Sequence, residues 1–189
     1  SGSIMASFSG INTATVISPT TVKVTWTQSD VYKFYDIYAD YQKDPIVKDQ
    51  IFGEALIENL TPGATYKFKV LGKGSTVGAG NDRQIEVKMW DRFAGVSKTT
   101  KDGDGFVEVS WDYDQQPQEY YIFVGEEAAP TEESTKGWTN PDVTTTAKKH
   151  LFKNLKGSTN YYFVVQAKYR QGEFERSTKA LMESSNSTF

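Results

Sequence analysis

Few residues in this chain of 189 have both the type and the spacing that catalysis or metal binding needs. The single histidine, His150, stands at an apparent strand start in Lys148–Phe152, and no triad or metal partner accompanies it. We expect it to be an ordinary solvent-facing residue. Asp102 and Asp104 resemble the start of a calcium loop, but apolar residues from Phe106 onward stand where oxygen ligands are needed. A turn between two strands is the better interpretation of this segment.

Two acidic pairs, Glu126–Glu127 and Glu132–Glu133, have the residue type of glycosidase carboxylates. Both flank Pro130 in a polar stretch, which favours a solvated loop over a catalytic cleft. We therefore expect no catalytic residues, no metal site and no cofactor.

The glycine-rich stretch Gly72–Gly80 follows a predicted strand, as a phosphate-binding loop would. It lacks the Gly-Lys-Ser/Thr ending of such a loop, and a strand pattern follows where a helix should begin. It is either a plain linker between two strands or a flexible recognition loop. The second alternative makes Lys73, Ser75 and Thr76 candidate contact residues.

The elements that would position any site come in two copies, because the chain repeats one module. The first matches recur at a shift of 85 residues and the later ones at a shift of 95, so the second copy carries an insertion of ten residues. A repeat of this length determines the architecture before any local pattern does. The matching segments are Phe8–Ile11 with Phe93–Val96, Trp26 with Trp111, Tyr35–Tyr38 with Tyr120–Phe123, and Tyr66–Val70 with Tyr161–Val165.

The repeat predicts two domains of about ninety residues, a size that can bury one two-layer core. Only Asp91 and Arg92 separate the modules, and two residues cannot form a flexible tether, so we expect an end-to-end pair. The predicted boundaries are a cloning scar or tail at 1–7, a first domain at 8–91, a second domain at 92–182 with its insertion at about 126–148, and a tail at 183–189.

Period-two alternation dominates both modules and predicts strands with one buried face. Turn formers separate about seven short strands per module, which favours antiparallel β-sandwiches. In each module a tyrosine follows a leucine by six residues, Leu60 with Tyr66 and Leu155 with Tyr161. This spacing is typical of a tyrosine corner, in which a buried ring returns its hydroxyl to nearby backbone.

These motifs together resemble the fibronectin type III family. They are a tryptophan on the second strand, Tyr-x-Ile on the third and Leu-x-Pro-Gly-x-x-Tyr before the sixth, and the second module departs from them by lacking the proline. The resemblance covers roughly 8–90 and 93–181. It implies an all-β fold of two tandem fibronectin type III-like, that is immunoglobulin-like, sandwiches. Trp26, Tyr66, Trp111 and Tyr161 are the expected core anchors.

Composition excludes several partners. The net charge of −3 and the pI of about 5.3 disfavour nucleic acid, which attracts basic surfaces. No apolar run approaches the roughly 18 residues of a membrane-spanning helix, so we expect no direct membrane insertion. The chain has no cysteine, which excludes disulfides and thiolate metal sites.

One apolar cluster distinguishes the second module. If the alternate residues of its strands point inward, then Tyr121, Phe123, Tyr162 and Val164 point outward together, and Trp138 of the insertion can reach them. The equivalent residues of the first module are more polar. Such a cluster is either covered by the insertion or used as a binding surface.

We therefore expect a non-enzymatic binding or adhesion segment of a larger secreted or cell-surface protein of bacterial origin. It would act as a monomer on a protein or a glycan. The alternative is a rigid spacer that presents a neighbouring domain, such as a carbohydrate-active one, and the third hypothesis is an unrecognised enzyme. An uncovered apolar patch would favour binding over spacing, but the fold alone names no ligand.

Overall fold

The computed structural model describes residues 8–74, 83–177 and 180–185, and it divides into two compact units, Ser1–Asp91 (unit 1) and Arg92–Phe189 (unit 2). Every regular element in these residues is a strand. Unit 1 contains β1 (Ile11–Ser18), β2 (Thr21–Trp26), β3 (Phe34–Ala39), β4 (Val47–Gln50), β5 (Glu54–Ile57), β6 (Thr65–Lys73) and β7 (Ile85–Lys88). Unit 2 contains β8 (Lys98–Lys101), β9 (Val107–Ser110), β10 (Glu119–Glu126), β11 (Val143–Thr145), β12 (Lys149–Phe152), β13 (Asn160–Arg170), β14 (Glu173–Arg176) and β15 (Leu181–Ser184).

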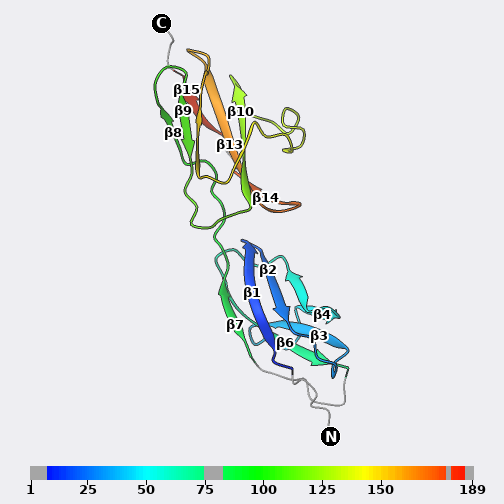
Figure 1. Cartoon of the computed structure of the whole chain (residues 1–189). Helices are drawn as coiled ribbons and strands as arrows, with labels where there is room; N and C mark the ends of the chain where they lie inside the picture. Colours follow the sequence, from blue (N-terminus) through cyan, green and yellow to red (C-terminus); the bar gives the residue numbers. More distant parts are fainter. Residues whose placement is uncertain (1–7, 75–82, 178–179, 186–189) are drawn as a thin grey trace. The chain divides into compact units, whose positions relative to one another are not determined.

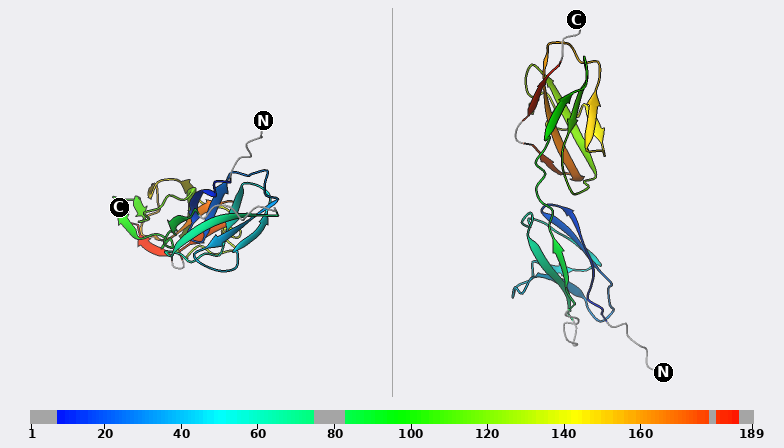
Figure 2. Two further views of the ribbon diagram at one scale, coloured as in Figure 1. Left: turned by 90° about the horizontal axis from the view of Figure 1, so that it is seen from below. Right: turned by 90° about the vertical axis from the view of Figure 1, so that its left-hand side faces the viewer.

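Each unit is a sandwich of two antiparallel sheets (Figures 1 and 2). In unit 1 the sheets have the orders β1-β2-β5 and β4-β3-β6-β7. Unit 2 repeats this arrangement as β12-β9-β8 and β11-β10-β13-β14, with β15 also paired to β13. The predicted all-β fold of tandem sandwiches is therefore confirmed.

The core of each unit is built on one aromatic group that the repeat duplicates. In unit 2, Trp111 and Tyr120 meet edge to face with ring centroids 5.1 Å apart, and Phe93 lies 5.5 Å from Tyr120. Both members of the Trp26–Tyr35 pair in unit 1 are likewise buried, with centroids 5.6 Å apart. Large buried aromatic surfaces of this kind dominate the free energy of folding of a small sandwich.

Both tyrosine corners are formed. The backbone N–H of Thr61 donates to the hydroxyl of Tyr66 at 2.9 Å, and that of Lys156 donates to the hydroxyl of Tyr161 at 2.8 Å. Tyr161 is buried as expected, but Tyr66 is only partly buried. The hydrogen bond of the tyrosine corner is therefore present in both units. The burial of Tyr66 differs from the expectation, because Tyr66 packs at the margin of the unit 1 core rather than inside it.

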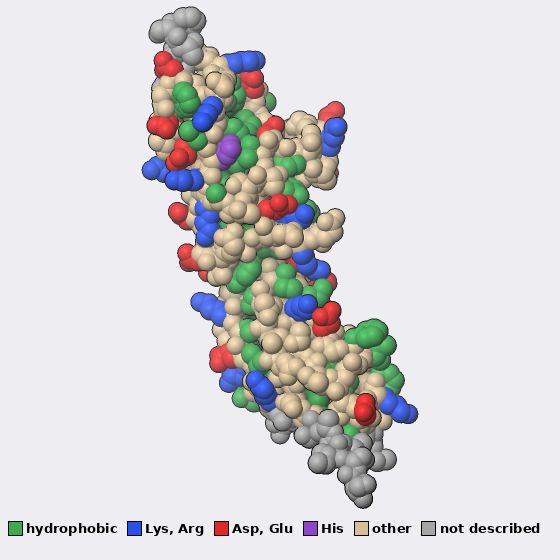
Figure 3. Space-filling view, viewed as in Figure 1, with side chains coloured by type: hydrophobic (Ala, Val, Ile, Leu, Met, Phe, Trp, Pro, Cys, Tyr) green, Lys and Arg blue, Asp and Glu red, His purple; other side chains and the backbone are tan. Residues whose placement is uncertain are grey.

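Unit 2 differs from the sequence expectation at two points. Its last strand position is divided into β14 and β15, and β15 runs to Ser184, two residues past the predicted domain end. His150 is partly buried rather than solvent-facing, because it lies opposite buried Val109 and cross-strand partners share a face. Its ring meets that of Phe152 at 4.7 Å, and burial lowers the pKa of His150 below its usual value. Part of this side chain is still visible at the surface of unit 2 (Figure 3).

Within the described ranges, no helix is long and apolar enough to cross a bilayer.

Candidate binding surface

The insertion folds on itself through hydroxyl groups. Thr131 and Ser134 cap each other, since each backbone N–H donates to the other side-chain hydroxyl, at 2.9 and 3.0 Å. The buried Thr135 hydroxyl donates to the carbonyl of Thr131 at 2.7 Å and accepts the backbone N–H of Trp138 at 2.9 Å. These short-range bonds give the insertion a defined shape.

The backbone next to Trp138 is strained. Lys136, Gly137 and Trp138 have φ values of 52°, 71° and 63°, three successive residues in the left-handed region. This conformation costs a residue with a Cβ roughly 1–2 kcal/mol. Such strain persists only where surrounding contacts determine the conformation. The contacts made by Trp138 must therefore hold the insertion in place.

Trp138 is anchored from three sides. Its indole meets the ring of Phe123 edge to face, with centroids 5.2 Å apart and an interplanar angle of 88°. The guanidinium carbon of Arg176 lies 4.1 Å from the centre of the indole, and its Nη1 donates to Oε1 of Gln166 at 3.3 Å. The side-chain amide of Gln166 in turn donates to the carbonyl of Trp138 at 3.4 Å.

The strand register explains why these residues meet. Phe123 lies opposite Val164 in the β10–β13 ladder, while Gln166 pairs with both Tyr121 of β10 and Arg176 of β14. Cross-strand partners project to the same face, so all five side chains lie on the outer face of the sheet. The insertion leaves the end of β10 and returns through β11 beside this face (Figure 1).

A glycine allows the insertion to lie this close. A Cβ on Gly125 would be 2.0 Å from the carbonyl oxygen of Ala128 and 3.0 Å from the ring of Pro130. Because Gly125 shares the outward parity of Phe123 along β10, the first residues of the insertion pass directly over it. The absence of a side chain at position 125 of β10 therefore makes room for the first residues of the insertion.

Aromatic contacts continue from the insertion toward the sheet edge. The ring of Tyr121 lies 6.4 Å from that of Phe123 and 5.7 Å from that of Phe174 on β14. Nζ of Lys168 lies 5.9 Å from the centre of the Tyr121 ring and 3.5 Å from Oε1 of Glu119. We call this surface the aromatic face, and it consists of Tyr121, Trp138 and Phe174 with Arg176 beside them, while Phe123 lies buried beneath Trp138.

The expected outward cluster is only partly accessible. Phe123 and Val164 are buried, and Trp138 of the insertion packs on the Phe123 ring, whereas Tyr121, Tyr162 and Trp138 are partly exposed. Phe123 and Val164 therefore cannot contact a partner directly, which corrects their place in the expected binding surface. Of the two alternatives for this cluster, cover by the insertion accounts for Phe123.

Two accessible residues of the aromatic face were missed from the sequence. Phe174 and Arg176 follow the tight turn at Gly172 and are both exposed. Their spacing of two along a short strand indicates a shared face, so alternation could have identified them. Arg176 has no acidic partner among the described residues, whereas Lys168 is paired.

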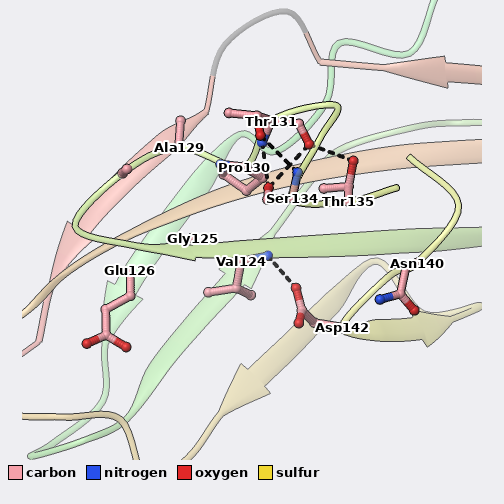
Figure 4. A pocket seen from close by; sticks show the side chains of 11 residues that line it. Val124, Gly125, Glu126, Ala129, Pro130, Thr131, Ser134, Thr135, Asn140 and Asp142 are labelled. Carbon is pink, nitrogen blue, oxygen red and sulfur yellow. Dashed lines mark hydrogen bonds between the residues drawn. The ribbon is translucent and has the colours of Figure 1, made fainter. Parts of the chain in front are cut away.

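A pocket of about 350 Å³ lies between the insertion and β10 (Figure 4). One carboxylate oxygen of Asp142 accepts the backbone N–H of Val124 at 2.7 Å, and Asn140 lies beside it on the same wall. The carboxylate of Glu126 is paired with Lys156 at 2.9 Å. The pocket is therefore rich in hydrogen-bond acceptors but has no cluster of titratable groups suited to catalysis.

Lys73, the described member of the candidate loop, has a structural role. Its Nζ bridges Oδ1 of Asp36 at 3.0 Å and Oδ1 of Asp49 at 2.5 Å, and the backbone N–H of Asp49 donates to Asp36 at 2.9 Å. Hydrogen bonds to Asp49 and Asp36 raise the pKa of Lys73. This lysine therefore ties β6 to β3 and β4, and its side chain is 39% exposed. Ser75 and Thr76 lie outside the described residues.

The remaining acidic residues singled out in the sequence lie in turns or on the exposed insertion. The turn after Asp102 closes the β8–β9 hairpin, with the Asp102 N–H bonded to the carbonyl of Phe106 at 3.1 Å. Glu127 accepts the backbone N–H of Asn160 at 3.2 Å, while Glu132 and Glu133 lie on the exposed insertion. In the described part of the chain, no group of three or more His, Asp and Glu side chains is arranged to hold a metal ion.

Unit 1 exposes apolar side chains of its own. Tyr41 is 81% exposed and Phe52 is 70% exposed, and both lie in connections that flank β4. Hydrophobic side chains gather around this side of unit 1 in Figure 3. Of these side chains, Tyr41 meets the ammonium group of Lys67 on β6, which lies 5.7 Å from the centre of its ring.

No family model and no curated protein matches the chain. Among solved structures it is similar to the FN1–FN3 domains of chicken CNTN1, at 15% identity with a TM-score of 0.45, covering 96% of this chain and 65% of that one. It is also similar to a two-domain fibronectin type III segment of chicken tenascin, at 14% identity with a TM-score of 0.39, covering 95% and 97% of the two chains. This chain thus spans less than two thirds of the CNTN1 chain. The strand order of both units and their tyrosine corners describe tandem sandwiches with the fibronectin type III-like fold.

Proposed function

We propose that this chain is a non-catalytic binding segment of an extracellular or cell-surface protein, and that the aromatic face of unit 2 contacts its partner. The observation that carries the proposal is the placement of the insertion. This segment, which breaks the repeat, contributes none of the buried hydrophobic side chains of the described residues, and its Trp138 instead packs on an outer sheet face beside Arg176.

The composition of the aromatic face supports recognition. Tyrosine, tryptophan and arginine are the residues that most often dominate binding free energy at interfaces. Their rings and the guanidinium are already ordered by mutual contacts, which lowers the conformational entropy lost on binding. A spacer requires no such surface, since it needs only stable sandwiches and a polar exterior.

The test compares two apolar residues with nearly equal exposure. Phe174 is 42% exposed on the aromatic face, and Leu56 is 41% exposed on β5 of unit 1. The full chain is screened against protein and glycan arrays, and the binding of each hit is then measured for Phe174→Ser and Leu56→Ser. We expect Phe174→Ser to weaken binding about tenfold or more, as truncation of an interface anchor does, and Leu56→Ser to leave it unchanged.

Other outcomes identify other functions. If Phe52→Ser or Leu56→Ser abolishes binding and Phe174→Ser does not, the edge of unit 1 is the contact surface. If no array component binds the chain, the spacer hypothesis replaces the binding proposal.

A further inference from the structure

The edge of the aromatic face offers both an unpaired cation and an open strand. Arg176 is exposed, its guanidinium carbon lies over the Trp138 ring at 4.1 Å from the ring centre, and one of its nitrogens donates to Gln166. A guanidinium held in this way presents its remaining N–H groups in a fixed fork, the geometry that carboxylates bind in a bidentate manner. No carboxylate of the described residues occupies that fork.

Among the described residues, no strand pairs with β14 on the side away from β13. β14 is the last strand of its sheet, and the N–H of Ser177 donates to the carbonyl of Val165 on β13 at 3.3 Å. Because backbone groups alternate along an antiparallel strand, those of Glu175 also face β13, while those of Phe174 and Arg176 face outward. An exposed edge of this kind is a template for an added strand.

This open stretch is short and well defined. At its far end, a Cβ on Gly95 would lie 2.0 Å from Cβ of Ser177, so the chain near Gly95 closes the edge there. The open stretch of β14 therefore runs from Phe174 to Arg176. Its two outward side chains, Phe174 and Arg176, are about 6.8 Å apart along the strand.

We propose that β14 binds an extended segment of a partner protein as an added strand, and that this segment carries an acidic residue two positions from an apolar one. The apolar side chain packs on Phe174 and Tyr121, and the carboxylate binds the fork of Arg176. Backbone hydrogen bonds to Phe174 and Arg176 supply affinity, and the two side chains supply specificity. The inference rests on the proposed function, because it assigns a partner class to the same face.

The experiment uses the full chain labelled with ¹⁵N. The probes are two peptide libraries in a Thr/Ser background, one with the fixed frame Leu-Xaa-Glu and one with Glu-Xaa-Leu, so that both strand directions are sampled. Matched libraries with Gln in place of Glu serve as controls. We expect saturable shifts of the Phe174 and Arg176 amide signals and binding about tenfold weaker for the Gln libraries, since a hydrogen bond to a charged group is lost.

Variants distinguish bidentate binding by the Arg176 guanidinium from nonspecific attraction by positive charge. Arg176→Gln is expected to abolish the preference for Glu over Gln, and Arg176→Lys to retain only part of it. Lys149→Gln removes an equal charge from an exposed position of β12, in the other sheet of unit 2, and should change nothing.

Three results overturn the inference. The first is peptide binding of equal strength for the Glu and the Gln libraries, or a preference for Glu that persists in Arg176→Gln. The second is binding of heparin fragments to these amides without peptide binding, which makes the partner an acidic glycan. The third is the absence of any shift with either probe. The proposed function fails separately, either if no array component binds the chain or if Phe174→Ser has no effect on array binding.

Discussion

Replacing Trp138 by alanine removes the two ring contacts that hold the strained insertion against unit 2. The edge-to-face contact with Phe123 is worth about 0.5–1.5 kcal/mol, and the stacking of Arg176 on the indole about 0.5–1 kcal/mol at an exposed site. Trp138 is only partly buried, so the roughly 3–5 kcal/mol of a fully buried aromatic is an upper limit. We expect the insertion to lose about 2 kcal/mol of local stability.

Amide hydrogen exchange followed by NMR measures this loss locally. The amides of Thr135 and Thr139 are bonded within the insertion, at 3.0 and 3.1 Å from their acceptors. In Trp138→Ala their exchange should accelerate about tenfold to a hundredfold, because each 1.4 kcal/mol changes the open population tenfold. Amides in the β10–β13 ladder should keep their protection, since those strands retain their own core. In Trp138→Phe, which preserves an aromatic contact, the exchange rates of Thr135 and Thr139 should lie between those of the wild type and those of Trp138→Ala.

Two results would refute this reasoning. Unchanged protection of Thr135 and Thr139 would show that the hydroxyl caps alone hold the insertion. Equal loss of protection throughout unit 2 would show that the insertion belongs to the cooperative core. A double-mutant cycle with Arg176→Ala adds a further check, because direct stacking requires a coupling energy of about 0.5–1 kcal/mol.

Three further predictions concern unit 2. Gly125→Ala places a Cβ 2.0 Å from the Ala128 carbonyl and should destabilise unit 2 by about 1–3 kcal/mol in denaturant unfolding, and an unchanged midpoint would show that the insertion can move away. Tyr161→Phe removes the acceptor of the Lys156 N–H and should cost about 1 kcal/mol, seen as a lower unfolding temperature of unit 2 in calorimetry. Burial lowers the pKa of His150, so the unfolded state binds its proton more readily and stability falls as pH drops through about 6.5. His150→Gln should flatten this part of the pH dependence, and an identical pH profile in wild type and variant would remove His150 as its source.

The sequence by itself determined the architecture, because local rules govern it. The shift of 85 residues that relates Trp26 to Trp111 predicted two copies of one core, and each copy is built on the same aromatic group. Period-two alternation identified the inward side chains, since a strand projects successive residues to opposite faces. The spacing from leucine to tyrosine predicted both tyrosine corners, which depend on bonds across only five residues.

The sequence also placed Tyr121, Phe123 and Trp138 in one neighbourhood, but only as a choice between a covered and an uncovered patch. Alternation reports which side of a strand a residue faces, and it carries no information about what lies on that side. The insertion covers Phe123 because strained backbone, Gly125 and Trp138 act together in space.

Contacts between distant segments were decided by the tertiary structure alone. Lys73 had the type and setting of a recognition residue, and only the order of the sheet, with β3 between β6 and β4, brings it to Asp36 and Asp49. Arg176 likewise meets Trp138 only because the turn at Gly172 returns β14 to the outer edge of the sheet. Such pairings depend on sheet order and register, which are set by the packing of the whole unit rather than by any local stretch of residues.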